Sequence, residues 1–428
     1  MKVLMFGWEF PPHITGGLGT ACYGLTKALS NFGTDMIFVV PKLFGDEKAP
    51  FMRLREAGSI ELIHDESEQK MVWEKLQYIE VGSNLIPYLD PEIYARLFEN
   101  TVLNTEEIKY RIFSEKFQFS GSYGPNLLEE VSRYAIIASV IAAQNTFDVI
   151  HSHDWLTYPA GIAAKEVSGR PLVIHVHATE FDRSGENINQ NVYDIERRGM
   201  EAADRIITVS NLTRRIVIEK YGISEDKVFT VYNGVQTGNY KEHDFTRGVD
   251  EKVVTFLGRI TYQKGPDYFV EAANLVLKKD PNVRFVMAGS GDMMTRMIRR
   301  VAKLRIADKF HFTGFLKGDD VHRMFAISDV YVMPSVSEPF GISPLEAMTA
   351  NVPVIISKQS GVSEILNHAI KIDFWDIDEM ADSIYGLLHY EGLTDMFKKY
   401  GRSEVENLKW DHAAHRVNEI YRDVTGLE

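Results

Sequence analysis

Two cations stand close together in the segment GRITYQKG, residues 258–265, directly after a short apolar run. Arg259 and Lys264 would donate charge-assisted hydrogen bonds, and on a turn between a strand and a helix such donors suit a phosphate group. The flanking glycines let the backbone approach an anion closely. A solvated loop would also tolerate both side chains, but their pairing in a chain with a net charge of −13 favours a phosphate site.

A second segment whose residues could take part in binding or catalysis is SEPFGISPLE, residues 337–346. It predicts a helix start with a capping box, in which Ser343 is the N-cap, a proline follows and Glu346 is the third helical residue. The backbone amides of Gly341, Ile342 and Ser343, at that helix start, would add a binding site for an anion. Capping does not explain Glu338, which precedes the helix on an irregular loop. We therefore expect a site for a charged leaving group and a neutral polyol.

The segment GGLG, residues 16–19, follows the first apolar run of the chain and opens a helix. Backbone N–H groups of Gly17, Leu18 and Gly19 would then meet an anion at the positive end of that helix. A tight turn without any ligand is the alternative, and the sequence leaves both interpretations open.

Four histidines alternate along two neighbouring expected strands, His151 with His153 and His175 with His177. A period of two puts each pair on one face of a sheet, so four imidazoles could build a zinc site. No carboxylate or thiolate is evidently placed to complete the ligand shell, so we predict no metal and expect ordinary sheet histidines. His177 and Asp154 stand at strand ends, where this architecture holds reactive residues.

Short apolar runs rich in Val and Ile alternate with amphipathic stretches of helix length, which indicates βαβ units and parallel sheets. The expected strands lie near residues 3–8, 35–41, 148–153, 171–177, 205–210, 228–233, 253–258, 284–288, 310–313, 330–334, 353–357 and 370–373. The first helix has an apolar face followed by a glycine stop; the residues are Leu18, Cys22, Leu25, Leu29 and Gly33.

Two successive α/β series of similar size predict two doubly wound, Rossmann-like domains that face each other across a cleft. The first domain is expected to comprise residues 1–235 together with 405–428, and the second residues 236–404. The polar stretch 236–251 is the expected linker. Residues 45–130 fit the α/β pattern poorly and are expected to form an inserted, mostly helical excursion.

Composition excludes several classes of protein. A chain of 428 residues with a net charge of −13 is not a general nucleic-acid binder, and one cysteine excludes a disulfide framework and suits a reducing cytoplasm. The longest apolar run, Tyr134–Ala143, is half the length that a membrane span needs, so stable membrane insertion is not expected. The basic stretch 293–309 is interpreted as a solvated outer helix, with a membrane-facing role as the alternative.

Taken together, these residues resemble the retaining glycosyltransferases with the two-domain GT-B fold, in particular the glycogen and starch synthase-like group. The resemblance covers most of the chain and rests on motifs in a fixed order. They are WEFPP at 8–12, GGLG at 16–19, HDW at 153–155, His177-Ala178, VYNGV at 231–235, Gly258-Arg259 with Lys264-Gly265, the glutamates Glu338 and Glu346, and a final helix from Trp410 to Tyr421.

The resemblance implies a role for each matching residue. Arg259 and Lys264 would hold the diphosphate, Glu338 the sugar hydroxyls and Glu346 the ribose. His177 would contact the donor sugar near the reacting carbon. Asp154 would lie beside the acceptor, and Gly17, Leu18 and Gly19 would close on the diphosphate from the first domain. The family needs no metal and no cofactor beyond its nucleotide-sugar donor.

The implied reaction moves glucose from ADP- or UDP-glucose to the non-reducing end of an α-1,4-glucan. Bacterial glycogen synthases usually carry Lys where this chain has Ile14, which favours the broader family, whereas the WEFPP opening favours the glucan branch. One alternative keeps the chemistry but changes the acceptor to a cell-surface or lipid-linked glycan. A sugar-nucleotide epimerase and a non-catalytic metal or sugar binder are further alternatives. The donor base, acceptor length and oligomeric state stay open.

Overall fold

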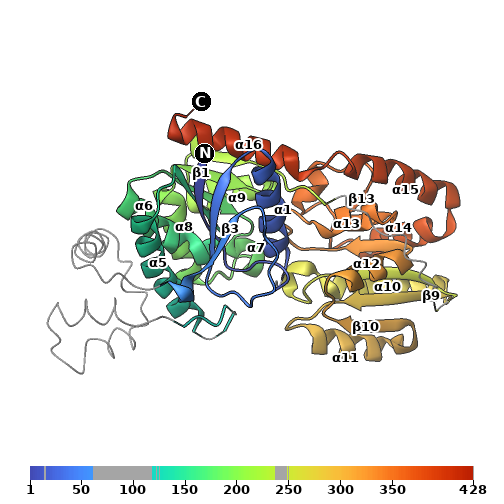
Figure 1. Ribbon diagram of the computed structural model, residues 1–428. Helices are drawn as coiled ribbons and strands as arrows, with labels where there is room; N and C mark the ends of the chain where they lie inside the picture. The colour runs from blue at the N-terminus through green and yellow to red at the C-terminus, as the bar shows by residue number, and fades with distance from the viewer. Residues whose placement is uncertain are drawn as a thin grey trace, which may run out of the picture.

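The computed structural model describes residues 1–13, 16–60, 118–121, 123–124, 126–236, 248 and 250–427. Within them the chain forms two parallel sheets, each with helices on both faces, as Figure 1 shows. Most of the expected insertion and most of the expected linker lie outside the described residues. The predicted fold class, two doubly wound α/β domains, is confirmed by this architecture.

The first sheet has the strand order β3-β2-β1-β4-β5-β6-β7, and its paired strands all run parallel. Its strands are β1 (Lys2–Phe6), β2 (Asp35–Val40), β3 (Arg53–Glu56), β4 (Val149–His153), β5 (Leu172–Val176), β6 (Arg205–Thr208) and β7 (Val228–Thr230). Its helices are α1 (Gly17–Asn31), α5 (Leu127–Gln144), α6 (Tyr158–Ser168), α7 (Glu180–Ser184), α8 (Gln190–Ala202) and α9 (Asn211–Tyr221).

The second sheet repeats this pattern with the order β10-β9-β8-β11-β12-β13. Its strands are β8 (Lys252–Leu257), β9 (Val283–Ala288), β10 (Phe310–Gly314), β11 (Val330–Met333), β12 (Val354–Ser357) and β13 (Ile370–Ile372). The helices that follow are α10 (Pro266–Lys279), α11 (Met294–Leu304), α12 (Asp319–Ile327), α13 (Ser343–Thr349), α14 (Ile377–His389), α15 (Glu391–Val405) and α16 (Trp410–Thr425).

All twelve expected strands are present, and the described residues contain one further strand that was missed. Strand β3 lies within the segment that was expected to be mostly helical, so that expectation is wrong for Arg53–Glu56. Its sequence, RLRE, has no apolar run because it is an edge strand paired only with β2 and half-exposed. A strand of this kind gives no hydrophobic signal.

The central strands are apolar on both faces because helices cover both. In β1, Leu4 and Phe6 pack into the core on the side of α5 and α6, whereas Val3 and Met5 pack into the core formed with α1 and α16. This alternation is the period of two that a strand imposes. Helix α1 ends as predicted, with Gly33 in the left-handed region at φ +77.

The last helix returns to the first sheet, as predicted from the Trp410–Tyr421 segment. Helix α16 lies along α1, and Figure 1 shows it along the top of the first domain. The Trp410 ring packs against the backbone of Gly24, where a Cβ atom would be 2.3 Å from the nearest ring atom. The close approach of these two helices therefore depends on a glycine at position 24.

Replacing Gly24 by alanine is expected to destabilise the protein by about 1–3 kcal/mol, the usual cost of overpacking a well-filled core. Denaturant unfolding measures this change. Gly392→Ala in α15 is the matched control, because a Cβ there meets no atom within 4 Å, and it should be neutral or slightly stabilising. Equal stabilities of Gly24→Ala and the wild-type protein would contradict this packing.

The carboxyl ends of the two sheets face each other. Ser337, after β11, donates a hydrogen bond of 2.6 Å to Asp182 Oδ1, after β5. The Glu364 carboxylate, after β12, accepts from the backbone amides of Asn211 and Leu212 at the start of α9, at 2.9 and 2.7 Å. Contacts of this kind hold the two strand-end edges together, so loops from both sheets can build one site.

Candidate active site

Both sheets have the doubly wound order, in which the crossover reverses between β1 and β4 and again between β8 and β11. Ligands of such sheets bind at that switch point, beyond the carboxyl ends of the strands. The GGLG segment follows β1 and His153-Asp154 ends β4, while the Arg259–Lys264 segment follows β8 and Glu338 follows β11. The fold thus gathers the residues singled out from sequence at the two switch points.

Lys264 and Glu338 form an ion pair between the loops after β8 and β11. Their side chains are only 19% and 9% exposed, and the Ser335 hydroxyl donates a further hydrogen bond of 3.2 Å to Glu338. The Glu338 backbone is fixed as well, since its N–H donates to the Gln359 carbonyl at 2.9 Å and its carbonyl accepts from Gly361 N–H at 2.8 Å. A buried, held carboxylate thus orients the Lys264 ammonium.

Arg259 is exposed at the same edge, where its guanidinium donates to Gln263 Oε1 at 3.3 Å. Lys264 ends a single helical turn, and Gly265 then adopts φ +64 before α10 begins. A Cβ at Gly265 would lie 2.0 Å from the Pro334 carbonyl oxygen, so only glycine allows this turn to pass so close to the loop after β11. The two cations therefore lie on one tight, glycine-dependent turn.

The predicted capping box at Ser343 is wrong. Ile342 already has helical dihedral angles and is the N-cap of α13, so Ser343 is the first helical residue and its side chain caps nothing. Glu346 is half-buried, and desolvation raises the pKa of its carboxyl to about 7. Ser343 and Glu346 therefore do not form the capping box that the sequence predicts.

On the first sheet, Asp154 and His177 are linked. Asp154 Oδ1 accepts hydrogen bonds from the backbone N–H groups of His177 at 2.7 Å and Ala178 at 3.2 Å. Asp154 is 8% exposed and has φ 60, an uncommon conformation for a non-glycine residue. Burial raises the pKa of its carboxyl to about 6, although the charge of Arg183 and the two amides oppose the rise. Asp154 thereby fixes the backbone that carries His177.

The four histidines form a stack of imidazole rings beneath this edge, with adjacent centroids 4.3–5.4 Å apart. Burial lowers the pKa of His151 and of His177 to about 3, so both rings are neutral at physiological pH. His151 Nδ1 is hydrogen-bonded to the Tyr421 hydroxyl, and His153 Nδ1 lies 3.0 Å from His177 Nε2. Only His177 reaches the partly exposed surface of the edge.

The start of α1 makes a contact that the sequence motifs do not indicate. A Cβ at Gly16 or Gly17 would meet no atom within 4 Å, so space is open in front of the helix. The Gly19 N–H, however, donates to Glu9 Oε1 at 3.2 Å, and Glu9 is only 7% exposed. One of the three amides expected to face an anion is thus already satisfied by an internal carboxylate. No local motif signals this contact between residues ten positions apart.

A buried charge network behind His177 was also missed. Arg183 pairs with Glu196 at 2.9 Å, and the Tyr221 hydroxyl donates a hydrogen bond to the same carboxylate. Burial raises the pKa of the Glu196 carboxyl to about 7. Thr179 and Asp182 form a capping box at the start of α7. This network holds α7 rigidly against the opposite sheet's loop, through Asp182 and Ser337. Its residues are spread over α7, α8 and α9, so only the fold reveals it.

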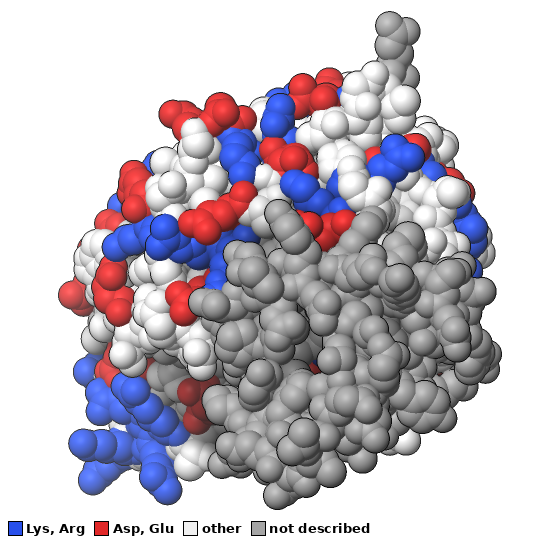
Figure 2. Space-filling model, turned by 90° about the vertical axis from the view of Figure 1, so that its left-hand side faces the viewer, with Lys and Arg blue, Asp and Glu red and all other residues white. Residues whose placement is uncertain are grey.

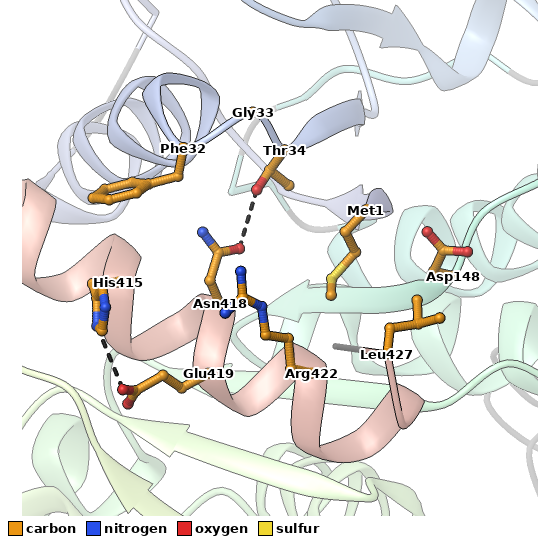
Figure 3. Close-up of a pocket in the computed structure, with 10 residues that line it drawn as sticks. All are labelled: Met1, Phe32, Gly33, Thr34, Asp148, His415, Asn418, Glu419, Arg422 and Leu427. Atoms are coloured by element: carbon orange, nitrogen blue, oxygen red, sulfur yellow. Dashed lines mark hydrogen bonds and ion pairs between the residues drawn. The ribbon is translucent and has the colours of Figure 1, made fainter.

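A pocket of the first sheet lies at the opposite edge (Figure 3). Its lining includes Met1 before β1, Thr34 before β2 and Asp148 before β4, together with residues of α16. Thr34 Oγ1 donates to Asn418 Oδ1 across it at 3.0 Å. This pocket is at the amino ends of the strands, away from the switch points, and is separate from the candidate site.

The basic segment 293–309 forms α11 on the outside of the second sheet. Figure 2 shows Lys and Arg side chains gathered at the lower edge of the molecule, at the height where Figure 1 places this helix. Arg300 and Arg296 pair with Glu271 and Asp267 of α10. These pairs agree with a solvated outer helix. Among the described residues, no helix combines the length and apolar character needed to cross a membrane.

Two facing Rossmann-like sheets with a cationic edge are the arrangement of the GT-B fold, and comparison with known proteins agrees. The family description "Glycosyl transferases group 1" matches residues 241–404, and "Glycosyltransferase Family 4" matches residues 102–239. Each description matches one part of the chain, and together they support a retaining glycosyltransferase of this kind, which transfers a sugar from a nucleotide-sugar donor.

Individual relatives match most of the chain. An uncharacterized glycosyltransferase of Methanocaldococcus jannaschii is 29% identical over 99% of this chain and 98% of its own length. A glycogen synthase of Mycobacterium tuberculosis is 24% identical over 85% of this chain and 80% of its own. Among solved structures, Anabaena HepE in complex with UDP and glucose has a TM-score of 0.69 at 17% identity, covering 99% and 100% of the two chains. The similarity to the Anabaena structure, at 17% identity, supports the fold alone.

Proposed function

We propose that this glycosyltransferase moves glucose from ADP- or UDP-glucose to the non-reducing end of an α-1,4-glucan, in the manner of a glycogen synthase. The observation that carries the proposal is the Lys264–Glu338 pair, which sits with Arg259 at the switch point of the second sheet and faces the His177 edge of the first. The WEFPP opening and the similarity to a glycogen synthase support the glucan acceptor.

In this proposal the donor lies along the edge of the second sheet. Arg259 and Lys264 bind the diphosphate, Glu338 accepts hydrogen bonds from sugar hydroxyls and Glu346 accepts them from the ribose. The amides of Gly341, Ile342 and Ser343 and those of Gly17 and Leu18 supply further donors. Glu9 already takes the Gly19 amide, so Gly19 contributes by allowing close approach of the backbone.

Departure of the diphosphate builds negative charge on phosphate and positive charge on the sugar ring. Preorganised cations such as Arg259 and Lys264 stabilise that leaving group without reorganising during the reaction. The acceptor hydroxyl attacks from the face that the leaving group departs, which preserves the anomeric configuration. His177 is neutral and so contacts the donor sugar without adding charge beside the developing cation. With the donor bound, the two facing edges would exclude water that otherwise hydrolyses it.

The role of Glu346 predicts a pH dependence. Ribose hydroxyls donate to an ionised carboxylate, and the pKa of Glu346 is about 7. We expect kcat/KM, which reports ionisations of the free enzyme, to fall below that value towards the lower level of the enzyme with a protonated Glu346. Glu346→Gln should remove this limb and leave one near pH 6 from Asp154. An unchanged limb near pH 7 in Glu346→Gln would contradict the assignment.

The acceptor is tested by incubating the enzyme with radiolabelled ADP- or UDP-glucose and glycogen. The proposal predicts label in the polymer that β-amylase, which cleaves from non-reducing ends, releases as maltose. Label that resists β-amylase, or no incorporation while the donor is consumed, would move the acceptor assignment to another glycan. Conversion of the donor to a second sugar nucleotide without acceptor would indicate an epimerase.

A cell-surface or lipid-linked glycan is the second candidate acceptor, and α11 is the observation that favours it. Ile298 is 47% exposed between the cations of that helix, and Arg299 and Lys303 are exposed beside it. Apolar and basic side chains on one face suit an anionic lipid surface. Flotation with anionic vesicles that is lost in Arg299→Glu/Lys303→Glu would favour this acceptor over soluble glucan.

A further inference from the structure

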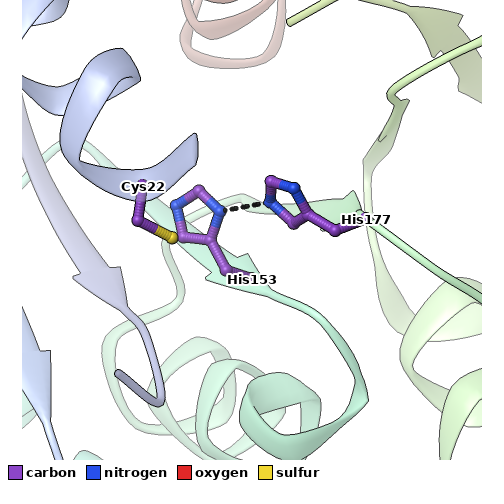
Figure 4. A group of neighbouring side chains, drawn as sticks. All are labelled: Cys22, His153 and His177. Carbon is purple, nitrogen blue, oxygen red and sulfur yellow. Dashed lines mark hydrogen bonds between the residues drawn. The ribbon is translucent and has the colours of Figure 1, made fainter. Parts of the chain in front are cut away.

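In the folded protein the thiol of Cys22 lies beside the histidine stack. Cys22 is on α1, far from the four histidines in sequence. Its Sγ, one ring nitrogen of His153 and one of His177 nevertheless lie within 4.8 Å of one another (Figure 4). The sequence predicts no metal because no carboxylate or thiolate is evidently placed beside the histidines. The fold supplies the missing ligand.

The three ligand atoms come from separate rigid elements. Cys22 is held in α1, His153 ends β4 and His177 follows β5. A tetrahedral zinc ion with Zn–N bonds of 2.0–2.1 Å and a Zn–S bond of 2.3 Å requires ligand atoms about 3.3–3.7 Å apart. The His153 Nδ1 to His177 Nε2 distance of 3.0 Å is already close to this separation. Small side-chain rotations would complete the geometry.

The interior around these residues leaves hydrogen-bonding capacity unused. Cys22 and His153 are 0% exposed, and His153 Nε2 has no hydrogen-bond partner among the described residues. Both nitrogens of the adjoining His175 also lack partners. An unsatisfied buried polar atom costs about 1–3 kcal/mol. On the His153 ring only Nδ1 is held by a hydrogen bond, so exchanging that bond for a bond to an ion leaves no further polar atom of this ring unsatisfied.

We propose that Cys22, His153 and His177 form a binding site for a thiophilic divalent cation, Zn²⁺ in particular, and that the bound ion inhibits sugar transfer. One thiolate and two imidazoles are a ligand set that zinc prefers, and three protein ligands leave a fourth position open. The thiol proton is released to solvent when the Zn–S bond forms. Inhibition rests on the proposed function, because His177 then coordinates the ion and is withdrawn from the donor sugar.

Metal binding is measured first, without reference to activity. Chelator-treated full-length protein is titrated with Co²⁺, which replaces Zn²⁺ and reports a thiolate ligand by a sulfur-to-metal charge-transfer band in the near ultraviolet. We expect one ion per chain, displaced by Zn²⁺, and loss of the band in Cys22→Ser with affinity for Zn²⁺ at least tenfold weaker. The absence of this band in the wild-type protein would overturn the proposal whatever the stability of the variant.

A surface group provides the matched control. His13, Asp46 and Glu47 also lie within bonding reach of one ion. Asp46 is exposed, the other two are partly exposed, and the group contains no sulfur. His13→Ala should leave the charge-transfer band and the Zn²⁺ affinity unchanged. Zinc that is retained in Cys22→Ser and lost in His13→Ala would place the ion at the surface and refute the buried site.

Inhibition is then measured on the wild-type enzyme as nucleoside diphosphate release at increasing Zn²⁺. The expected inhibition follows the same concentration dependence as zinc binding and is reversed by chelator. Full activity with one equivalent of zinc bound through Cys22 would refute the inhibitory role. An enzyme inactive with every donor would instead overturn the proposed function, while the cobalt spectrum would still decide whether the metal site exists.

Discussion

Lys264→Ala is expected to lower kcat about 100–1,000-fold, the usual effect of removing one preorganised donor that stabilises developing negative charge. Lys264 is the less exposed of the two cations at the second sheet's edge, and Glu338 holds its ammonium in place. The loss should appear mainly in kcat, because the charge on the leaving diphosphate grows in the transition state. Initial rates of nucleoside diphosphate release measure it.

Lys279→Ala is the control for this experiment. Lys279 ends the same helix that follows Lys264, and it pairs with Asp382 on the surface. Its removal tests whether loss of any lysine near α10 reduces activity, and wild-type kcat is expected. A Lys264→Ala enzyme with near-normal turnover would show that the diphosphate is not held at this turn.

Glu338→Ala is expected to reduce kcat/KM by a similar factor, about 100–1,000-fold. Two losses combine in this variant, since the carboxylate would no longer accept from the sugar hydroxyls and the half-buried Lys264 would lose its partner. Removing one member of a buried pair also destabilises the protein, by as much as about 3–5 kcal/mol. Thermal unfolding of the variant must therefore be measured beside its kinetics.

The Lys264→Ala/Glu338→Ala double variant separates these effects. Because the two side chains contact each other, their losses should be strongly non-additive, and the double variant should lose much less activity than the product of the single losses. Glu338→Gln, which keeps a hydrogen-bond acceptor, should be more stable than Glu338→Ala. Simple multiplication of the two effects would mean that the residues act independently and would contradict the coupled site.

The fold could be predicted from sequence because its central strands are covered on both faces. Runs such as MIFVV in β2 are apolar throughout, and that signal exists wherever helices bury both sides of a sheet. The missed strand β3 is the opposite case, since its exposed edge position permits arginine and glutamate. The predicted domain limits at 235, 236 and 404 remain predictions.

The site could be predicted only as far as its residues are local in sequence. Arg259 and Lys264 are five residues apart on one turn, so their pairing is visible in the motif. The error at Ser343 arose because the dihedral angles of Ile342, which are not encoded in any capping pattern, start the helix one residue early. Gly19 with Glu9 and Cys22 with His153 depend on contacts between separate elements, and sequence spacing gives no sign of them.

The most direct test of the central claim is release of nucleoside diphosphate from ADP-glucose and from UDP-glucose, each with and without glycogen, by the wild-type and Lys264→Ala enzymes. The account predicts release from at least one donor that depends on glycogen and falls about 100-fold or more in Lys264→Ala. Release that is equal in both enzymes, or absent with both donors, would contradict a glucosyl donor site built on Arg259, Lys264 and Glu338.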